Sequence, residues 1–279
     1  MIKEALICLE SSPSSDTATR LAITIASELG ASLVGLAIVD EPDIRAGTAT
    51  GFGGTTYKHE RDEALMADAR ERAAECLALF KRRCVDAAVA ATSLEVVGRP
   101  AESILAEMDR RDLTVIGRDA NFRFQTESDD TATREAILHR ATRPVLIVPE
   151  GTTGPLGKEI VVAYDGSRAA KRAMTSFAAT GLARSRNVYV ASVEDSGEQA
   201  WMMATAGVKI LADLNVAAEP RNIVSAHSSV EALASFSRKL GAGLIVMGAF
   251  AHNRIAHLFH GSVTRGLVES TPIPLYLQH

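Results

Sequence analysis

The sequence predicts an α/β protein built from two tandem doubly wound domains, each with a five-stranded parallel sheet. Three observations lead to this prediction. Short runs rich in Leu and β-branched residues alternate with stretches of helical periodicity, these runs are apolar almost throughout, and the whole pattern occurs twice. Strands that are apolar on both faces are typical of parallel sheets covered by helices. Alternating β and α elements in turn predict right-handed crossovers.

The repeat is clearest in the first two strands of each copy. KEALICLESS at 3–12 lies over KEIVVAYDGS at 158–167, and SLVGLAIVDE at 32–41 lies over NVYVASVEDS at 187–196, both at an offset of 155 residues. Later matches, such as LTVIG with LIVMG, fall at an offset of about 130. The first copy therefore contains about 25 extra residues between its second and fourth strands.

The elements follow from these runs in order. We expect strands near 5–9, 33–39, 92–97, 113–117 and 144–148, and again near 160–164, 187–193, 222–226, 244–248 and 274–278. Apolar residues at helical spacing predict helices at 17–29 and 169–183. A longer and highly charged pattern at 58–85 predicts a solvated helix with one core-facing side. Ser228 with Glu231 predicts a capping box at the start of another helix.

The two copies define domains at 1–149 and 158–279, and the Gly-, Thr- and Pro-rich segment EGTTGPLGK joins them. The extra material of the first copy includes the glycine-rich segment 45–57, which we expect to be mobile. This segment is either a lid that orders over a ligand or a tolerated surface insertion.

Composition excludes several classes of function. With 279 residues, 47% of them hydrophobic, 23% charged and a formal net charge of −4, the chain is typical of a soluble globular protein and is not expected to bind nucleic acid. No apolar run approaches the roughly 18 to 20 residues that would span a membrane. The cysteines Cys8, Cys76 and Cys84 form no CxxC pair and are interpreted as small core or boundary residues. A cytoplasmic location is expected.

A candidate site follows from the topology, because ligands of open α/β sheets bind beyond the carboxyl ends of the strands. In the second copy Gly248 ends a strand, and the segments 165–167, 193–195 and 261–262 should converge near it. Small residues at 248, 251 and 261 would let the backbone approach a bulky anion. The helix expected to begin near Ser262 would add unpaired N–H groups and a partial positive charge. The pattern therefore predicts a phosphate site.

Several side chains could complete this site. Arg254 could make a charge-assisted contact with a phosphate, and the hydroxyls of Ser262 and Thr264 could donate hydrogen bonds. Asp165 lies across the expected cleft, where it could accept a hydrogen bond from a base or a ribose.

These motifs resemble the universal stress protein family. They are VVAYDGS after a lysine, LIVMGAF at the end of the fourth strand, and a small residue followed after nine residues by GSVT. The family pattern is Gly, two residues, Gly, nine residues, Gly, Ser or Thr. The resemblance covers nearly the whole chain as two tandem copies and is strongest in 158–279. It implies an adenine nucleotide alpha hydrolase-like fold for each domain and a stress-response or regulatory protein that binds ATP, or ADP or AMP, with or without Mg²⁺.

The resemblance also implies a role for individual residues. It assigns the adenine to Asp165, followed by Gly166, and to the backbone of Val193; the ribose side to Met247 and Gly248; and the phosphates to Ala251, Gly261, Ser262 and Val263. His252 stands where family members often carry a histidine in the nucleotide loop. Ala251 replaces the family's second glycine. Alanine keeps its N–H but disfavours positive φ, so binding requires an ordinary backbone conformation at this position.

The first copy departs further from the family pattern. Gly117 is present, but Thr131-Ala132 stands where Gly-Ser would be, and Asp129 and Asp130 directly before it would repel a triphosphate. Glu10 replaces the aspartate at the adenine position, and Ser11 replaces the glycine. We expect that the first domain does not bind ATP in the family's manner. It either binds another ligand or serves as a structural partner.

The closing strands of the two copies resemble the family's edge strands, which pair across a dimer. In a tandem chain they can pair with each other and hide both edges, forming an intramolecular pseudo-dimer. This arrangement leaves a further homodimer open.

Three alternative functions compete with nucleotide binding. His252, His257 and His260 suggest a zinc site, but the second copy has no cysteine to join them. A slow nucleotide hydrolase or an adenylyl-transfer enzyme is a second alternative, although neither a G-x-S-x-G elbow nor a P-loop occurs. The third is a ligand-free module for protein interaction.

Overall fold

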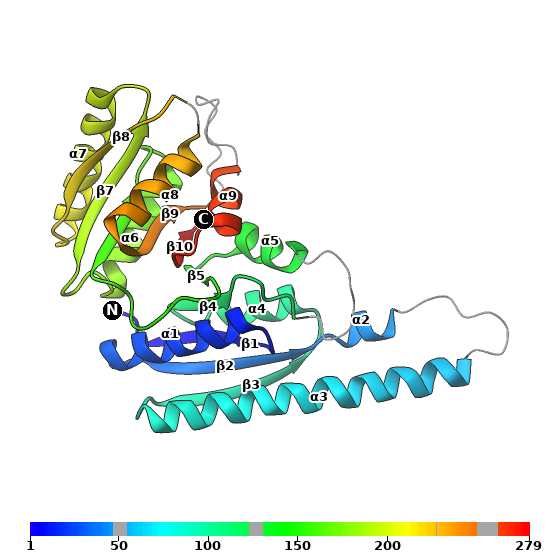
Figure 1. Cartoon of the computed structure of the whole chain (residues 1–279). Helices are drawn as coiled ribbons and strands as arrows, with labels where there is room; N and C mark the ends of the chain where they lie inside the picture. Colours follow the sequence, from blue (N-terminus) through cyan, green and yellow to red (C-terminus); the bar gives the residue numbers. More distant parts are fainter. Residues whose placement is uncertain (47–54, 123–130, 227, 250–261) are drawn as a thin grey trace.

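The described residues form one continuous ten-stranded sheet. The computed structural model describes residues 1–46, 55–122, 131–226, 228–249 and 262–279. In these residues the strand order is β3-β2-β1-β4-β5-β10-β9-β6-β7-β8. The strands of the first half of the chain therefore form one end of this order, and those of the second half form the other (Figure 1).

Both halves contain the expected alternation of strands and helices. The first half consists of β1 (Glu4–Leu9), α1 (Pro13–Leu29), β2 (Ser32–Val39), α2 (Glu41–Arg45), α3 (Thr55–Asp86), β3 (Ala91–Val97), α4 (Pro100–Met108), β4 (Leu113–Gly117), α5 (Thr131–Arg140) and β5 (Val145–Val148). The second consists of β6 (Glu159–Ala163), α6 (Arg168–Thr180), β7 (Asn187–Glu194), α7 (Gly197–Asp213), β8 (Glu219–Val224), α8 (Ser229–Leu240), β9 (Ala242–Gly248), α9 (Ser262–Ser270) and β10 (Leu275–Gln278). Each expected strand is present, and β8 begins three residues earlier than predicted.

The pairing register of the strands confirms the internal repeat. Glu4 of β1 lies opposite Ser32 of β2, and Glu159 of β6 lies opposite Asn187 of β7. Both pairs are related by the offset of 155 residues that the sequence shows. Equivalent positions in the two halves can therefore be compared residue by residue.

The two halves are joined through their closing strands, as the sequence predicts. β5 and β10 pair antiparallel, with Leu146 opposite Tyr276, whereas the other strand pairs of the sheet are parallel. Figure 1 shows these two strands where the halves meet. The pairing places both strands in the interior of the sheet, so neither leaves an exposed edge.

Helices cover both faces of the sheet, and the core on each face is shared by the two halves. One buried cluster contains Leu21 of α1 together with Phe177 of α6, and the other contains Ile104 of α4 together with Leu267 of α9. At the join, Tyr276 is fully buried, its ring packs edge-on against Phe177, and its hydroxyl lies 2.9 Å from the Ser176 hydroxyl. The seam is therefore part of the hydrophobic core.

Capping residues fix the starts of the helices next to the site. The Ser167 hydroxyl accepts the N–H of Ala170 at 3.0 Å at the start of α6. Ser12 does the same for Ser15 at the start of α1, at 3.2 Å. Ser228 accepts the N–H of Glu231 at 3.2 Å, which confirms the serine's part of the predicted capping box.

The long helix α3 has the single core-facing side that its sequence predicts. Met66, Ala69, Ala73, Phe80 and Cys84 recur at three- and four-residue spacing, with one wider step, and are buried against the first half. Figure 1 shows the helix running beside β2 and β3. The three cysteines are free thiols. Most of the glycine-rich segment 45–57, at 47–54, lies outside the described residues.

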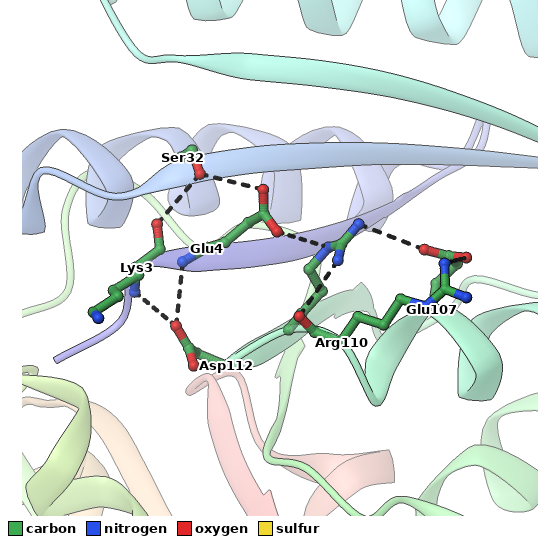
Figure 2. Close-up of polar contacts among 7 residues, drawn as sticks. Lys3, Glu4, Ser32, Glu107, Arg110 and Asp112 are labelled. Carbon is green, nitrogen blue, oxygen red and sulfur yellow. Dashed lines mark hydrogen bonds and ion pairs between the residues drawn. The ribbon is translucent and has the colours of Figure 1, made fainter.

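A polar network ties together the amino ends of β1 and β4 (Figure 2). The Asp112 carboxylate accepts the backbone N–H groups of Lys3 at 2.7 Å and Glu4 at 3.2 Å. Arg111 lies 3.1 Å from the Glu4 carboxylate and 3.5 Å from that of Glu107 at the end of α4. The charged groups at this end of the strands therefore stabilise the fold by joining β1, α4 and the start of β4.

Within the described part of the chain, no helix has both the length and the apolar character needed to cross a bilayer.

Candidate functional site

The structure brings six of the predicted site residues together around one cavity in the second half. The cavity lies at the carboxyl ends of β6, β7 and β9, beside the first turn of α9. Its lining includes the predicted residues Asp165, Val193, Met247, Gly248, Val263 and Thr264. Ser167, from the segment 165–167 that was expected to converge here, also lines it. The remaining lining residues were not singled out from the sequence, namely Ala163, Tyr164, Ala170, Ala191, Ser229 and Leu233.

The turn after β6 positions Asp165. One oxygen of its carboxylate accepts the N–H of Ser167 at 2.9 Å. Gly166 between them has φ +77°, a conformation that side-chain-bearing residues rarely adopt. Gly166 therefore contributes by shaping the turn that holds Asp165, and it is not among the cavity-lining residues.

The strand-end glycine has a packing role that the sequence interpretation missed. A Cβ added at Gly248 would lie 2.5 Å from the backbone of Ala169 and Ala170 in the first turn of α6. In the first half, a Cβ at Gly117 would lie 2.6 Å from the backbone nitrogen of Ser15 in α1. A helix start lies against the strand end in both halves. The glycine is therefore required whether or not a ligand approaches.

One end of the cavity is acidic. Glu194 ends β7 near Asp165 and Asp195; burial raises the pKa of the Glu194 carboxyl, and the two neighbouring carboxylates raise it further. Burial and the charge of Asp165 likewise raise the pKa of Tyr164. This end of the cavity favours hydrogen-bond donors and opposes phosphate.

The walls of the cavity are largely apolar. Val193, Met247, Leu233 and Val263 line it, and Ala191, which is almost fully buried, contributes only a methyl group. Small and apolar walls around a few polar groups are typical of sites for small organic ligands. The lining therefore favours an apolar group of a ligand.

The phosphate side of the predicted site lies mostly beyond what the structure describes. Ala251, His252, Arg254 and Gly261 fall outside the described residues, as do His257 and His260 of the zinc alternative. The helix α9 begins at Ser262, where the sequence predicts a helix start, and Val263 and Thr264 of its first turn line the cavity. Among the described residues, no group of three His, Cys, Asp or Glu side chains could hold a metal ion.

The first half carries different side chains in the equivalent region. At the register positions of Ala163 and Ala191 stand Cys8 and Leu36, which belong to the same buried cluster as Phe122. Phe122 lies in the loop after β4 and is 2% exposed. The Glu10 carboxylate accepts backbone N–H groups from that loop.

The fold and the cavity define a class: a doubly wound α/β unit, present twice, with a cavity at the carboxyl ends of its parallel strands. The sequence model of the Universal stress protein family matches residues 1–149 and 157–277. The chain therefore belongs to the universal stress protein family, with two tandem copies of the family's domain.

Known proteins of similar length agree with this assignment. A curated universal stress protein of Synechocystis sp. is 22% identical over 289 residues, covering 98% of this chain and 99% of the relative. The crystal structure of a universal stress protein from Archaeoglobus fulgidus superposes with a TM-score of 0.73 at 16% identity, covering 99% of this chain and 97% of the other. A functionally unknown protein from Pseudomonas aeruginosa gives a TM-score of 0.58 at 12% identity, covering 99% and 92%. These structures share the fold over the whole chain.

Proposed function

We propose that the second half binds an adenine nucleotide, with ATP as the first candidate, and that the protein acts as a nucleotide-binding stress-response or regulatory protein. The observation that carries the proposal is the convergence of six predicted residues around one cavity at the carboxyl ends of β6, β7 and β9. Resemblance to family members with the glycine pattern adds support, since those members bind ATP.

The charge distribution suggests an orientation for the nucleotide. The Asp165 carboxylate at the acidic end can accept a hydrogen bond from the amino group of adenine, and the backbone of Val193 can form a second hydrogen bond with the base. The apolar walls then enclose the ring, and the ribose lies along Met247 and Gly248. The phosphates point toward the start of α9, where helix N–H groups favour anions.

The remaining predicted residues would serve the phosphates. Gly261, Ser262 and Val263 offer backbone N–H groups, the Thr264 hydroxyl can donate, and Arg254 and His252 can add charge. Mg²⁺ would offset the phosphate charge without a dedicated protein cage, because it commonly binds through substrate phosphates and water.

The direct test is mass spectrometry of the small molecules released when the native protein is denatured, together with calorimetry against ATP and Mg²⁺. We expect one adenine nucleotide per chain. Gly261→Val should weaken binding by at least about tenfold by placing a branched side chain at the helix start. The matched substitution in the first half, Thr131→Val, should leave binding unchanged.

Other outcomes would support the alternatives. Absence of both released nucleotide and binding heat would overturn the proposal in favour of a ligand-free interaction module. Rapid ATP turnover that is lost in Ser262→Ala would instead identify a hydrolase or adenylyl-transfer enzyme.

A further inference from the structure

The loop after β4 in the first half is held by side chains from the segment that follows β1 and from the first turn of α1. One oxygen of the Glu10 carboxylate accepts the backbone N–H groups of both Asn121 and Phe122, each at 2.9 Å. The N–H of Asp119 in the same loop donates to the Ser14 hydroxyl at 3.1 Å. Glu10 and Asn121 are 111 residues apart in sequence, so these are tertiary contacts.

The backbone at this point has the geometry of an anion site. Phe122 has φ +59°, which is rare for a bulky residue. Successive N–H groups next to a left-handed residue can converge on one acceptor and form a concave site for an anion. Charge-assisted bonds from two amides to one carboxylate oxygen are about twice as strong as neutral ones.

We propose that the amides of Asn121 and Phe122 form an anion-binding site for a small carboxylate, and that the Glu10 carboxylate is its permanent intramolecular ligand. The matching residue of the second half is Asp165, whose side chain is one methylene shorter and accepts the N–H of Ser167 in its own turn. Glu10 is thus a specificity-determining residue: it reaches the neighbouring loop and excludes an external anion from the first half.

The packing around the loop agrees with this assignment. The Phe122 ring is almost completely buried, in the same cluster as Leu36 and Cys8. Burial of the ring and capture of the amides both hold the loop against the sheet. A carboxylate of the same chain therefore already occupies the acceptor position in front of these two amides.

Substitution of Glu10 tests this directly, because Glu10→Ala removes a group the size of acetate and leaves two backbone donors without their acceptor. Hydrogen exchange of the Asn121 and Phe122 amides should accelerate by about tenfold or more in Glu10→Ala. Glu10→Gln should show a smaller acceleration, since its amide oxygen can still accept both N–H groups without the charge.

Chemical rescue separates a ligand site from a merely structural contact. Acetate should slow the exchange of these two amides in Glu10→Ala and raise its melting temperature, but should do neither in the wild type. The control Glu75→Ala removes an exposed carboxylate from the neighbouring helix α3 and should show no acetate effect.

Unchanged protection of the two amides in Glu10→Ala, or the same response to acetate in Glu10→Ala and in the wild type, would overturn the proposal. Nucleotide binding by the second half should stay at the wild-type level in Glu10→Ala. The exchange measurement does not depend on any nucleotide, so this inference and the proposed nucleotide site can fail independently.

Discussion

The two halves share one strand register but differ in what stands at the carboxyl ends of their strands. In the second half Ala163 and Ala191 line a cavity, whereas the larger residues Cys8 and Leu36, both fully buried, stand at the same register positions of the first half. The acidic residue after the first strand also differs, because Glu10 reaches across to the loop after β4. Larger side chains and one longer carboxylate therefore distinguish the strand ends of the two halves, while the strand register stays the same.

The comparison also separates residues needed for the fold from residues that the ligand would need. Each half has a glycine at the end of its fourth strand, Gly117 in the first and Gly248 in the second, because a helix start packs against that position. The Gly-Ser pair at 261–262 is replaced by Thr131-Ala132 in the first half, where α5 begins at Thr131, whereas α9 begins at Ser262. Of these signals, only the Gly-Ser pair distinguishes the second half from the first.

The largest effect is expected from the strand-end glycines. Gly117→Ala and Gly248→Ala should each lower the free energy of unfolding by about 2 kcal/mol or more, because the new methyl would overlap helix backbone. Denaturant titration of both variants measures this.

The control for the glycine pair is Gly154→Ala, in the segment that joins the halves. Its positive φ makes alanine unfavourable by about 1 kcal/mol, but nothing lies within 4 Å of the new methyl. A Gly248→Ala protein as stable as the wild type that no longer binds nucleotide would show that this glycine serves only the ligand.

Ala191→Leu should convert the second half toward the first. The larger side chain matches Leu36 and would fill the cavity beside β7, so nucleotide affinity should fall by about a hundredfold, the order of 3 kcal/mol. Calorimetry measures the affinity, and a melting temperature no lower than that of the wild type would show that the fold is intact. Unchanged affinity in a folded variant would place the ligand elsewhere.

Asp165→Ala should weaken nucleotide binding by about tenfold through the loss of one charged hydrogen-bond acceptor. Asp165→Asn keeps an acceptor oxygen for both Ser167 and the base, and should fall between the wild type and the alanine variant. Asp195→Ala serves as the control, since Asp195 is a charged neighbour that is not among the lining residues of the cavity. If Asp165→Ala and Asp195→Ala weaken binding equally, Asp165 contributes only through its negative charge and not through a hydrogen bond to the ligand.

The smallest effect concerns pH. The pKa of the Glu194 carboxyl is raised in the folded protein, so its ionised form is disfavoured there. The folded protein should therefore lose stability as the pH rises from below the ordinary pKa of 4.5 through the raised pKa of the folded state. Glu194→Gln removes this penalty and should raise the melting temperature at pH 7 by about 1 °C. The difference should vanish at pH values below 4.5. A difference that grows on acidification would contradict the assigned direction.

Most of the fold could be predicted because the buried parallel strands consist of nearly continuous apolar residues. The strand β8 was predicted three residues late, since it is an edge strand in which Pro220 and Arg221 interrupt the apolar run and only Ile223 and Val224 stand out. The short helix α2 was not predicted, because five residues do not establish a helical period.

The site was predictable only where topology fixes position. Strand ends bring together Asp165, Val193 and Gly248, because parallel strands end at one edge of a sheet. The contact of Glu10 with Asn121 could not be foreseen, since no local pattern links residues so far apart in sequence. The packing role of Gly248 was missed for the same reason: its neighbours belong to α6.

The pairing of β5 with β10 has a consequence for how the molecule responds to dilution. Two separate chains joined by such a seam would part at low concentration, whereas a short covalent connection holds the partners at an effective concentration of about the millimolar range. Because Tyr276 stays buried at any protein concentration, the second half keeps its neighbour whether or not the first half binds anything. Melting should accordingly be independent of protein concentration, and the first half can support its neighbour without a ligand of its own.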